Sequence, residues 1–195
     1  MTTSRPKPDR AIPAGRAVNT DSSPVDRLHH AVGVYGGSAA VARLCGPVLA
    51  GDPPASQDVL LYLGGNHALS MIENRSRMDK YWFRVWAARA LLYVWDPSLS
   101  STVVRALADE AWRVREMAAK VCLKRELGEA GDALAILLDD AVPRVRAAAC
   151  RALGAVGEAE YAPALRGLLD DPDSDVRTRA DQALDRMARR LDRPL

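Results

Sequence analysis

The chain has 195 residues, of which 48% are hydrophobic and 27% are charged. These values are close to the average for soluble globular proteins and argue against wholesale disorder. The formal net charge is only +2, which is unlike the bulk positive charge of a dedicated nucleic-acid binder. Aromatic residues make up only 5% of the chain, so Ala, Leu and Val must form the core. That composition favours closely packed helices.

The N-terminal residues 1–24 combine several prolines with Thr, Ser, Arg and Gly. Such a segment buries too little apolar surface to offset the conformational entropy that it would lose on folding. The composition therefore predicts a disordered, flexible tail over 1–24.

Residues 25–76 show helical spacing of apolar residues in three segments, 25–35, 38–49 and 56–75. Glycine- and proline-rich stretches separate these segments. We expect helices here that cap or extend the N-terminal end of a larger array.

A pattern with a period of 31 residues occupies the rest of the chain, from about residue 77. The segments 112–119, 143–150 and 174–181 align without gaps, and 82–91 contains an earlier copy. Each copy has apolar residues at helical spacing and is preceded by another short apolar helix. One repeat is therefore predicted to be a helical hairpin.

Each copy contains the pattern Asp-x-x-x-x-Val-Arg-x-x-Ala, which runs over 109–118, 140–149 and 171–180. This pattern resembles the HEAT repeat, and its short form is similar to the HEAT-like repeats of the phycobilisome lyase type. The resemblance implies an all-α, right-handed α-solenoid of stacked helical hairpins over 77–195. Together with the capping helices, we expect one continuous solenoid domain over 25–195.

The Asp and Arg positions of this pattern form two columns at the repeat period. In HEAT repeats such an Arg typically pairs with the Asp column of its own or the adjacent repeat, and here an Asp stands six residues upstream of each Arg. A paired guanidinium has few donors left for a ligand, so we interpret the columns as a structural ladder rather than a row of cations for an anionic polymer. The ladder residues are Asp109, Arg115, Asp140, Arg146, Asp171 and Arg177, with Arg84 in the same Arg column.

Two other sets of positions recur every 31 residues and lie beside the regularly spaced valines of the second helices. The resemblance would place these two columns on the concave face. All four tryptophans lie within one 31-residue stretch at the N-terminal end of the array, and Trp is favoured in binding hot spots. A solvated helix face and burial of the rings remain the alternatives, with Trp82 the ring most expected at the surface because its column is otherwise charged. The predicted partner-binding residues are Trp82, Trp86, Arg89, Trp112, Arg113, Lys120, Arg144 and Arg151.

Motifs for phosphate, zinc or acyl chemistry are missing from the sequence. The segment Asp171-x-Asp173-x-Asp175 resembles the opening of a calcium loop, but its sixth position is Val176 rather than Gly and its twelfth is Gln182 rather than Glu. We interpret it as a capped turn. No catalytic residue, metal ion or cofactor is predicted.

The expected location is the cytoplasm, without membrane contact. The sequence has no apolar run of about 20 residues and no signal-peptide core. Its three cysteines, Cys45, Cys122 and Cys150, form no CxxC pair. We expect them to be small buried residues in a reducing compartment.

The favoured function is a non-enzymatic interaction scaffold or adaptor that binds a partner protein across several repeats on its concave face. One alternative is a nucleic-acid binder resembling the HEAT-like DNA glycosylases, with the predicted basic residues as phosphate contacts. The near-neutral charge counts against it. A bilin lyase-like subunit is a third possibility, suggested only by the type of repeat, and analogy of fold is a weak argument for function.

Overall fold

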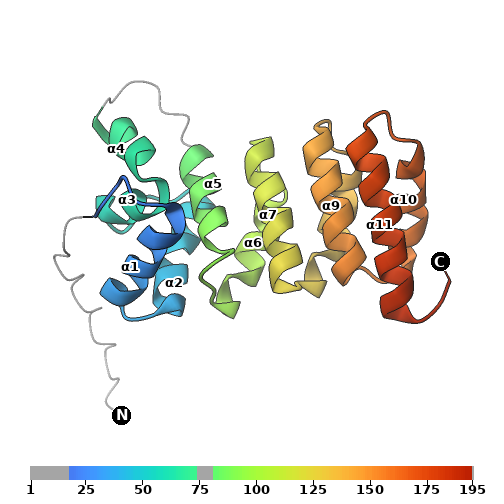
Figure 1. Cartoon of the computed structure of the whole chain (residues 1–195), viewed down its shortest axis with the longest axis horizontal. Coiled ribbons are helices and arrows are strands. Elements are labelled where there is room, and N and C mark those ends of the chain that lie inside the picture. Colours follow the sequence, from blue (N-terminus) through green and yellow to red (C-terminus); the bar gives the residue numbers. More distant parts are fainter. Residues whose placement is uncertain (1–17, 74–80, 195) are drawn as a thin grey trace, which may run out of the picture.

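The computed structural model describes residues 18–73 and 81–194, and every regular element within these ranges is a helix. Figure 1 shows an elongated stack that begins with a group of N-terminal helices and ends with α11 (Ser174–Leu191). The predicted all-α solenoid is therefore confirmed.

The N-terminal part consists of four helices joined by short turns. The hydroxyl of Ser23 accepts a hydrogen bond from the backbone N–H of Asp26 and caps the first helix. Gly36 ends this helix in a left-handed conformation, with φ of 79°. The helices are α1 (Pro24–Tyr35), α2 (Ser38–Ala50), α3 (Gln57–Gly64) and α4 (Asn66–Glu73).

None of the helices in the described ranges is by itself long and apolar enough to cross a membrane. Only α1 and α2 taken together satisfy the length and composition of a span, and these two helices are bent by 109° relative to each other.

The helix predicted over 56–75 is divided into α3 and α4 at Gly65. Gly65 has φ of +57°, and a Cβ atom there would lie 2.7 Å from the guanidinium of Arg27. Arg27 is buried, and its Nε donates to the carbonyl oxygen of Tyr62 at 3.1 Å. The close approach of this buried guanidinium explains why glycine is required at the break.

The tail predicted over 1–24 differs from the structure at its C-terminal end. Residues 1–17 lie outside the described residues, whereas 18–23 lie against the domain. Carbonyl oxygens of Thr20 and Ser22 accept hydrogen bonds from Arg27. Residues 18–23 are therefore part of the fold, because they satisfy donors of a buried arginine.

The repeats are helical hairpins in which a short first helix precedes a longer second helix. The first helices are α6 (Ser100–Ala106), α8 (Gly131–Ile136) and α10 (Ala162–Gly167), each preceded by a 3₁₀ turn. The second helices are α5 (Tyr81–Ala90), α7 (Trp112–Arg125), α9 (Pro143–Val156) and α11. The last three begin 31 residues apart, as the sequence period predicts.

The second helices form one layer and the first helices lie behind them (Figure 1). Helix α9 packs against α7 on one side and α11 on the other. Small and branched side chains at these contacts allow close approach of the helices. The valine and alanine columns are fully buried at Val114, Val145, Val176, Ala118, Ala149 and Ala180.

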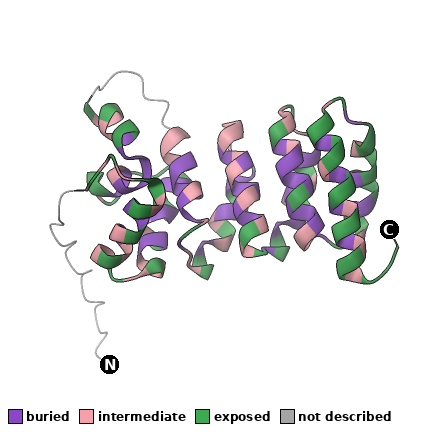
Figure 2. Ribbon diagram, in the orientation of Figure 1, coloured by how far each residue is buried: buried purple, intermediate pink, exposed green. Residues whose placement is uncertain are grey.

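The polar outer side of α11 distinguishes the last repeat from its neighbours. Cys150 and Gly154 of α9 are buried, whereas Asp181 and Asp185 stand at the equivalent positions of α11 and are exposed. Figure 2 shows the corresponding change, with more exposed surface on α11 than on α7. The charged columns are typical of a capping repeat whose outer side faces water.

The three cysteines are buried, as predicted. Burial raises the pKa of the thiols of Cys45, Cys122 and Cys150 to about 12. These thiols are therefore protonated at neutral pH and act as small core side chains.

Gly154 marks a close approach between α9 and α11, and we predict that Gly154→Ala is destabilising. The added Cβ would lie 2.7 Å from the Cα of Ala183 and 3.0 Å from its carbonyl oxygen. Since backbone cannot yield without moving the helix, the free energy of unfolding should fall by about 1–3 kcal/mol. Chemical denaturation measures this change.

Gly33→Ala is the matched control. Gly33 lies within α1, is exposed, and a Cβ there would meet nothing within 4 Å. Alanine should raise the free energy of unfolding by up to about 1 kcal/mol because it forms helices better than glycine. Equal stabilisation by both substitutions would contradict the close approach at Gly154.

Candidate functional site

A ladder of arginine–aspartate pairs joins each repeat to the next. Arg115 donates to both carboxylate oxygens of Asp140, with Nε–Oδ2 at 2.6 Å and Nη2–Oδ1 at 3.0 Å. The two residues are 25 positions apart, so the carboxylate comes from the following repeat. The same two bonds join Arg84 to Asp109 at 2.7 and 3.0 Å, and Arg146 to Asp171 at 2.8 and 2.8 Å.

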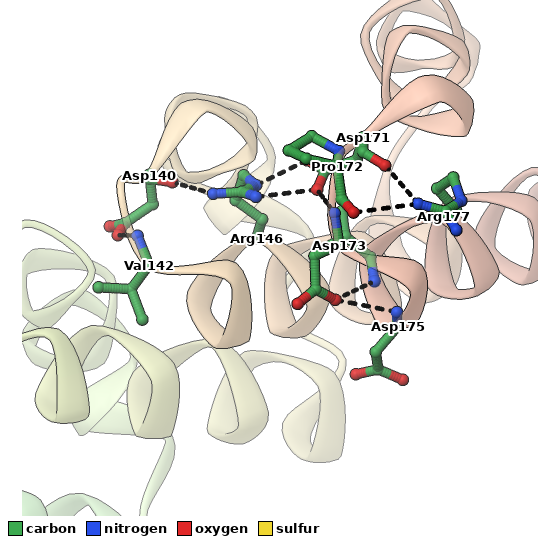
Figure 3. A network of polar contacts seen from close by, with 9 residues as sticks. Asp140, Val142, Arg146, Asp171, Pro172, Asp173, Asp175 and Arg177 are labelled. Carbon is green, nitrogen blue, oxygen red and sulfur yellow. Dashed lines mark hydrogen bonds and ion pairs between the residues drawn. The ribbon is translucent and has the colours of Figure 1, made fainter.

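Arg115, Arg146 and Arg177 also hold the turn that precedes their own helix. Figure 3 shows Arg146, whose Nη1 donates to the backbone carbonyl oxygen of Asp140 at 2.8 Å, six residues upstream. Asp171 in turn accepts the backbone N–H of Asp173 at 2.8 Å. For Arg115 and Arg146, the residue six positions upstream therefore contributes its backbone oxygen, while the carboxylate partner belongs to the next repeat. Among the described residues, Arg177 of the last repeat binds only the backbone oxygens of Asp171 and Pro172. Guanidinium groups engaged in this way have few donors for a ligand.

The three aspartates of the segment that resembles a calcium loop all serve local structure. Asp173 caps α11 by accepting the backbone N–H groups of Asp175 and Val176. Asp175 pairs with Arg179, with Oδ1 and Nε at 3.0 Å. Among the described residues, no group of three or more His, Cys, Asp or Glu side chains could hold a metal ion.

We predict that Asp171→Asn destabilises the protein at neutral pH and reduces its sensitivity to acid. Hydrogen bonds from Arg146 hold the pKa of Asp171 below its ordinary value, although burial opposes them. A lowered carboxyl pKa stabilises the fold above the unfolded-state pKa of about 3.9, and this stabilisation is lost as the pH falls through the folded-state pKa. At pH 7 the variant should lose about 3 kcal/mol, the low end of the range for breaking a buried ion pair.

Urea denaturation between pH 7 and pH 3 provides the measurement, and Asp170→Asn is the control. Asp170 is the exposed neighbour in the same turn, so its substitution should change stability by less than about 0.5 kcal/mol. The free energies of unfolding of Asp171→Asn and the wild type should converge as the pH falls. A difference between them that stays constant down to pH 3 would refute the role assigned to the carboxylate.

The exposed side of α5, α7, α9 and α11, here termed the second-helix face, contains an aromatic–guanidinium stack formed by Trp82, Arg113, Trp112 and Arg144. The Arg113 guanidinium carbon lies 5.3 Å from the ring centroid of Trp82 and 4.3 Å from that of Trp112. The Arg144 guanidinium carbon is 5.6 Å from the Trp112 ring. Each such contact contributes about 0.5–1 kcal/mol at an exposed site, so the side chains are ordered by one another.

Glu116 anchors the α9 end of the stack. Its carboxylate is buried and accepts hydrogen bonds from Arg144 at 3.1 and 3.3 Å and from Lys120 at 2.8 Å. This residue is absent from the predicted site because Ala147 and Thr178 occupy its column in the later repeats. Its only indication in the sequence is the spacing of four residues to Lys120, which is common on solvated helices.

The structure brings Trp82, Trp112, Arg113, Lys120 and Arg144 together, whereas Trp86 is buried and Arg89 is half-buried. Trp86 is buried, and a Cβ atom on Gly64 would lie 2.4 Å from its ring. Arg89 donates from Nη2 to the carbonyl oxygen of Leu63 at 2.9 Å, and burial lowers its pKa. Helix α3 packs against α5, so the surface position predicted for Trp86 is wrong, and Arg89 is bound by α3.

Arg151, the last predicted site residue, is exposed on α9 and lines two grooves of the second-helix face. Small alanine side chains line both grooves, from α9 in the first groove and from α11 in the second. The groove between α7 and α9 is lined by Glu116, Lys120, Arg144, Ala147, Ala148, Arg151 and Asp175. The groove between α9 and α11 is lined by Leu123, Arg151, Arg179, Gln182, Ala183 and Arg186.

The stacked hairpins and their ladder define an α-solenoid of HEAT-like repeats. A family model described as HEAT repeats matches residues 123–185. The structure of the complex of CpcE and CpcF of phycocyanin lyase from Nostoc sp. PCC7120 is similar to this chain, with a TM-score of 0.59 and 23% identity over 96% of this chain and 71% of that chain. The chain thus contains HEAT repeats and shares the fold of that structure.

An engineered protein of known structure is also similar, with a TM-score of 0.50 and 17% identity over 88% of this chain and 86% of that chain. A comparison with curated proteins found no match. At these levels of identity the similarities establish the fold, and function must be argued from the surface of this chain.

Proposed function

We propose that the protein is a non-enzymatic adaptor that binds a segment of a partner protein along its second-helix face. The observation that supports this proposal is the aromatic–guanidinium stack. Its side chains are held by contacts within this chain, including the hydrogen bond from Arg144 to Glu116. Large side chains that are already fixed lose little conformational entropy on binding. Trp and Arg are also the residue types most enriched in binding hot spots.

The dimensions of the face suit an extended segment. Packed helices lie about 8–10 Å apart, so four second helices span about 24–30 Å. Extended polypeptide advances about 3.3 Å per residue, and about eight residues would cover this length. A single segment could therefore contact several repeats at once, as in other solenoids.

The same contacts weigh against nucleic acid as the partner. Single-stranded nucleic acid is held by bases stacked on aromatic rings. The rings of Trp82 and Trp112 are already in contact with guanidinium groups of this chain. Two carboxylates, Glu116 and Asp175, also lie within the groove between α7 and α9, where they would repel phosphates.

The similar Nostoc structure is a complex of CpcE with CpcF, which motivates the choice of a protein as the partner of this chain. Its name also motivates the bilin lyase-like alternative. The likeness concerns the fold, so this alternative stays a prediction that bilin transfer in a reconstituted assay would test.

The adaptor proposal predicts that the triple variant Trp82→Ala, Arg113→Ala, Arg144→Ala loses its partner. Affinity capture from a lysate of the native cells, quantified by mass spectrometry with and without nuclease, provides the measurement. Removal of three hot-spot side chains should lower recovery of the partner at least about tenfold. Circular dichroism confirms that the variant is folded.

A triple variant of the opposite layer is the control. Arg105, Ile136 and Arg166 are exposed and belong to the first helices α6, α8 and α10, so their replacement by Ala should leave capture unchanged. Equal losses in both variants would refute the assigned face. A partner that disappears with nuclease treatment would favour the nucleic-acid alternative.

A further inference from the structure

The groove between α9 and α11 has a one-sided charge. Among the residues that the structure describes, its lining includes Arg151, Arg179 and Arg186 and no carboxylate. Leu123 and Ala183 supply apolar surface between these cations. Such a groove attracts a ligand that combines negative charge with short apolar contacts.

The three arginines of the groove differ in their ion pairs. Arg179 is held in place by Asp175 and by a hydrogen bond from its Nη1 to Oε1 of Gln182 at 2.9 Å. By contrast, Arg151 and Arg186 are exposed and form no ion pair with any residue in the described part of the chain. Each therefore presents a full guanidinium fork, which matches the geometry of a carboxylate.

Packing of the repeats does not explain this charge. The column of Arg186 contains Lys124 and Ala155, and the column of Arg179 contains Met117 and Ala148. The ladder arginines lie in a different column, in which Arg84, Arg115 and Arg146 bind the next repeat. Arg179 and Arg186 are thus arginines that only the last repeat has in their columns, whereas Arg151 continues a basic column with Arg89 and Lys120.

We propose that this groove binds carboxylate side chains of an acidic segment of the partner protein, with Arg151 and Arg186 as the contact residues. Arg179, which Asp175 positions, adds to the positive potential, while Leu123 and Ala183 contact the methylene groups of the segment. This inference rests on the proposed function, because the same segment would continue toward the aromatic–guanidinium stack.

A peptide suits the two adjacent grooves better than a nucleic acid does. Glu116 and Asp175 lie in the groove between α7 and α9, next to the cationic groove. A phosphate backbone has negative charge at every step and would meet these carboxylates. A peptide can place acidic residues in the cationic groove and neutral or basic residues beside Glu116 and Asp175.

Fluorescence anisotropy on the full chain tests the inference. The probes are a labelled peptide of about eight residues that alternates Glu with Ser, a matched Gln and Ser peptide, and a single-stranded oligonucleotide of similar length. The Glu peptide should bind at least about tenfold more tightly than the Gln peptide at low ionic strength, and added salt should reduce this difference.

The variant Arg151→Gln, Arg186→Gln should weaken binding of the Glu peptide at least about fivefold, whereas Arg105→Gln, Arg166→Gln should change it less than about twofold. Equal binding of the Glu and Gln peptides, equal effects of the two variants, or tighter binding of the oligonucleotide would overturn the inference.

Partner capture separates this inference from the proposed function. If the stack variant loses the partner and the variant of Arg151 and Arg186 retains it, the adaptor function stands and the acidic-segment inference fails. The opposite outcome is that binding of the Glu peptide depends on Arg151 and Arg186, while the stack variant captures the partner as well as the wild type does. In that case the stack is not the docking surface, and only the groove is supported as a binding site.

Discussion

The bidentate pair between an arginine of one repeat and an aspartate of the next is the interaction on which the stack depends. Arg146 fixes its own turn through the carbonyl oxygen of Asp140 and the next turn through the carboxylate of Asp171. Because Asp171 also accepts a backbone N–H at the start of the following helix, the pair sets the orientation of that helix. Alanine and glycine columns then allow close packing only in this register.

Arginines of the ladder that bind aspartates of the next repeat have few donors left for a ligand. The cations that remain for a ligand are therefore those outside the ladder. Side chains on the exposed side of the second helices lie outside the ladder, and they differ along the face. Aromatic rings and guanidinium groups gather near α5 and α7, around Trp82 and Trp112. Arg151 and Arg186, which form no ion pair within the described residues, line the groove between α9 and α11. A partner segment that recognised both ends would bind in a single direction.

Periodicity explains why much of the fold could be predicted from the sequence. A contact that every repeat makes in the same way leaves a column of similar residues, as at Val114, Val145 and Val176, and these columns are buried as expected. The exposed Asp181 in the otherwise small column likewise indicated the capping repeat. Contacts that occur once leave no column, and for this reason the break at Gly65 was missed.

The sequence by itself determined the helical hairpins, their 31-residue period and the residue types of the ladder, because these properties depend on local spacing. Only the tertiary structure decided which oxygen each ladder arginine binds and which candidate site residues reach the surface. Packing of α3 against α5 removed Trp86 and Arg89 from the face. Burial of Glu116 between Lys120 and Arg144 added a residue that no column marked. Such contacts join residues from different helices, and their energies depend on burial and distance, which periodicity does not encode.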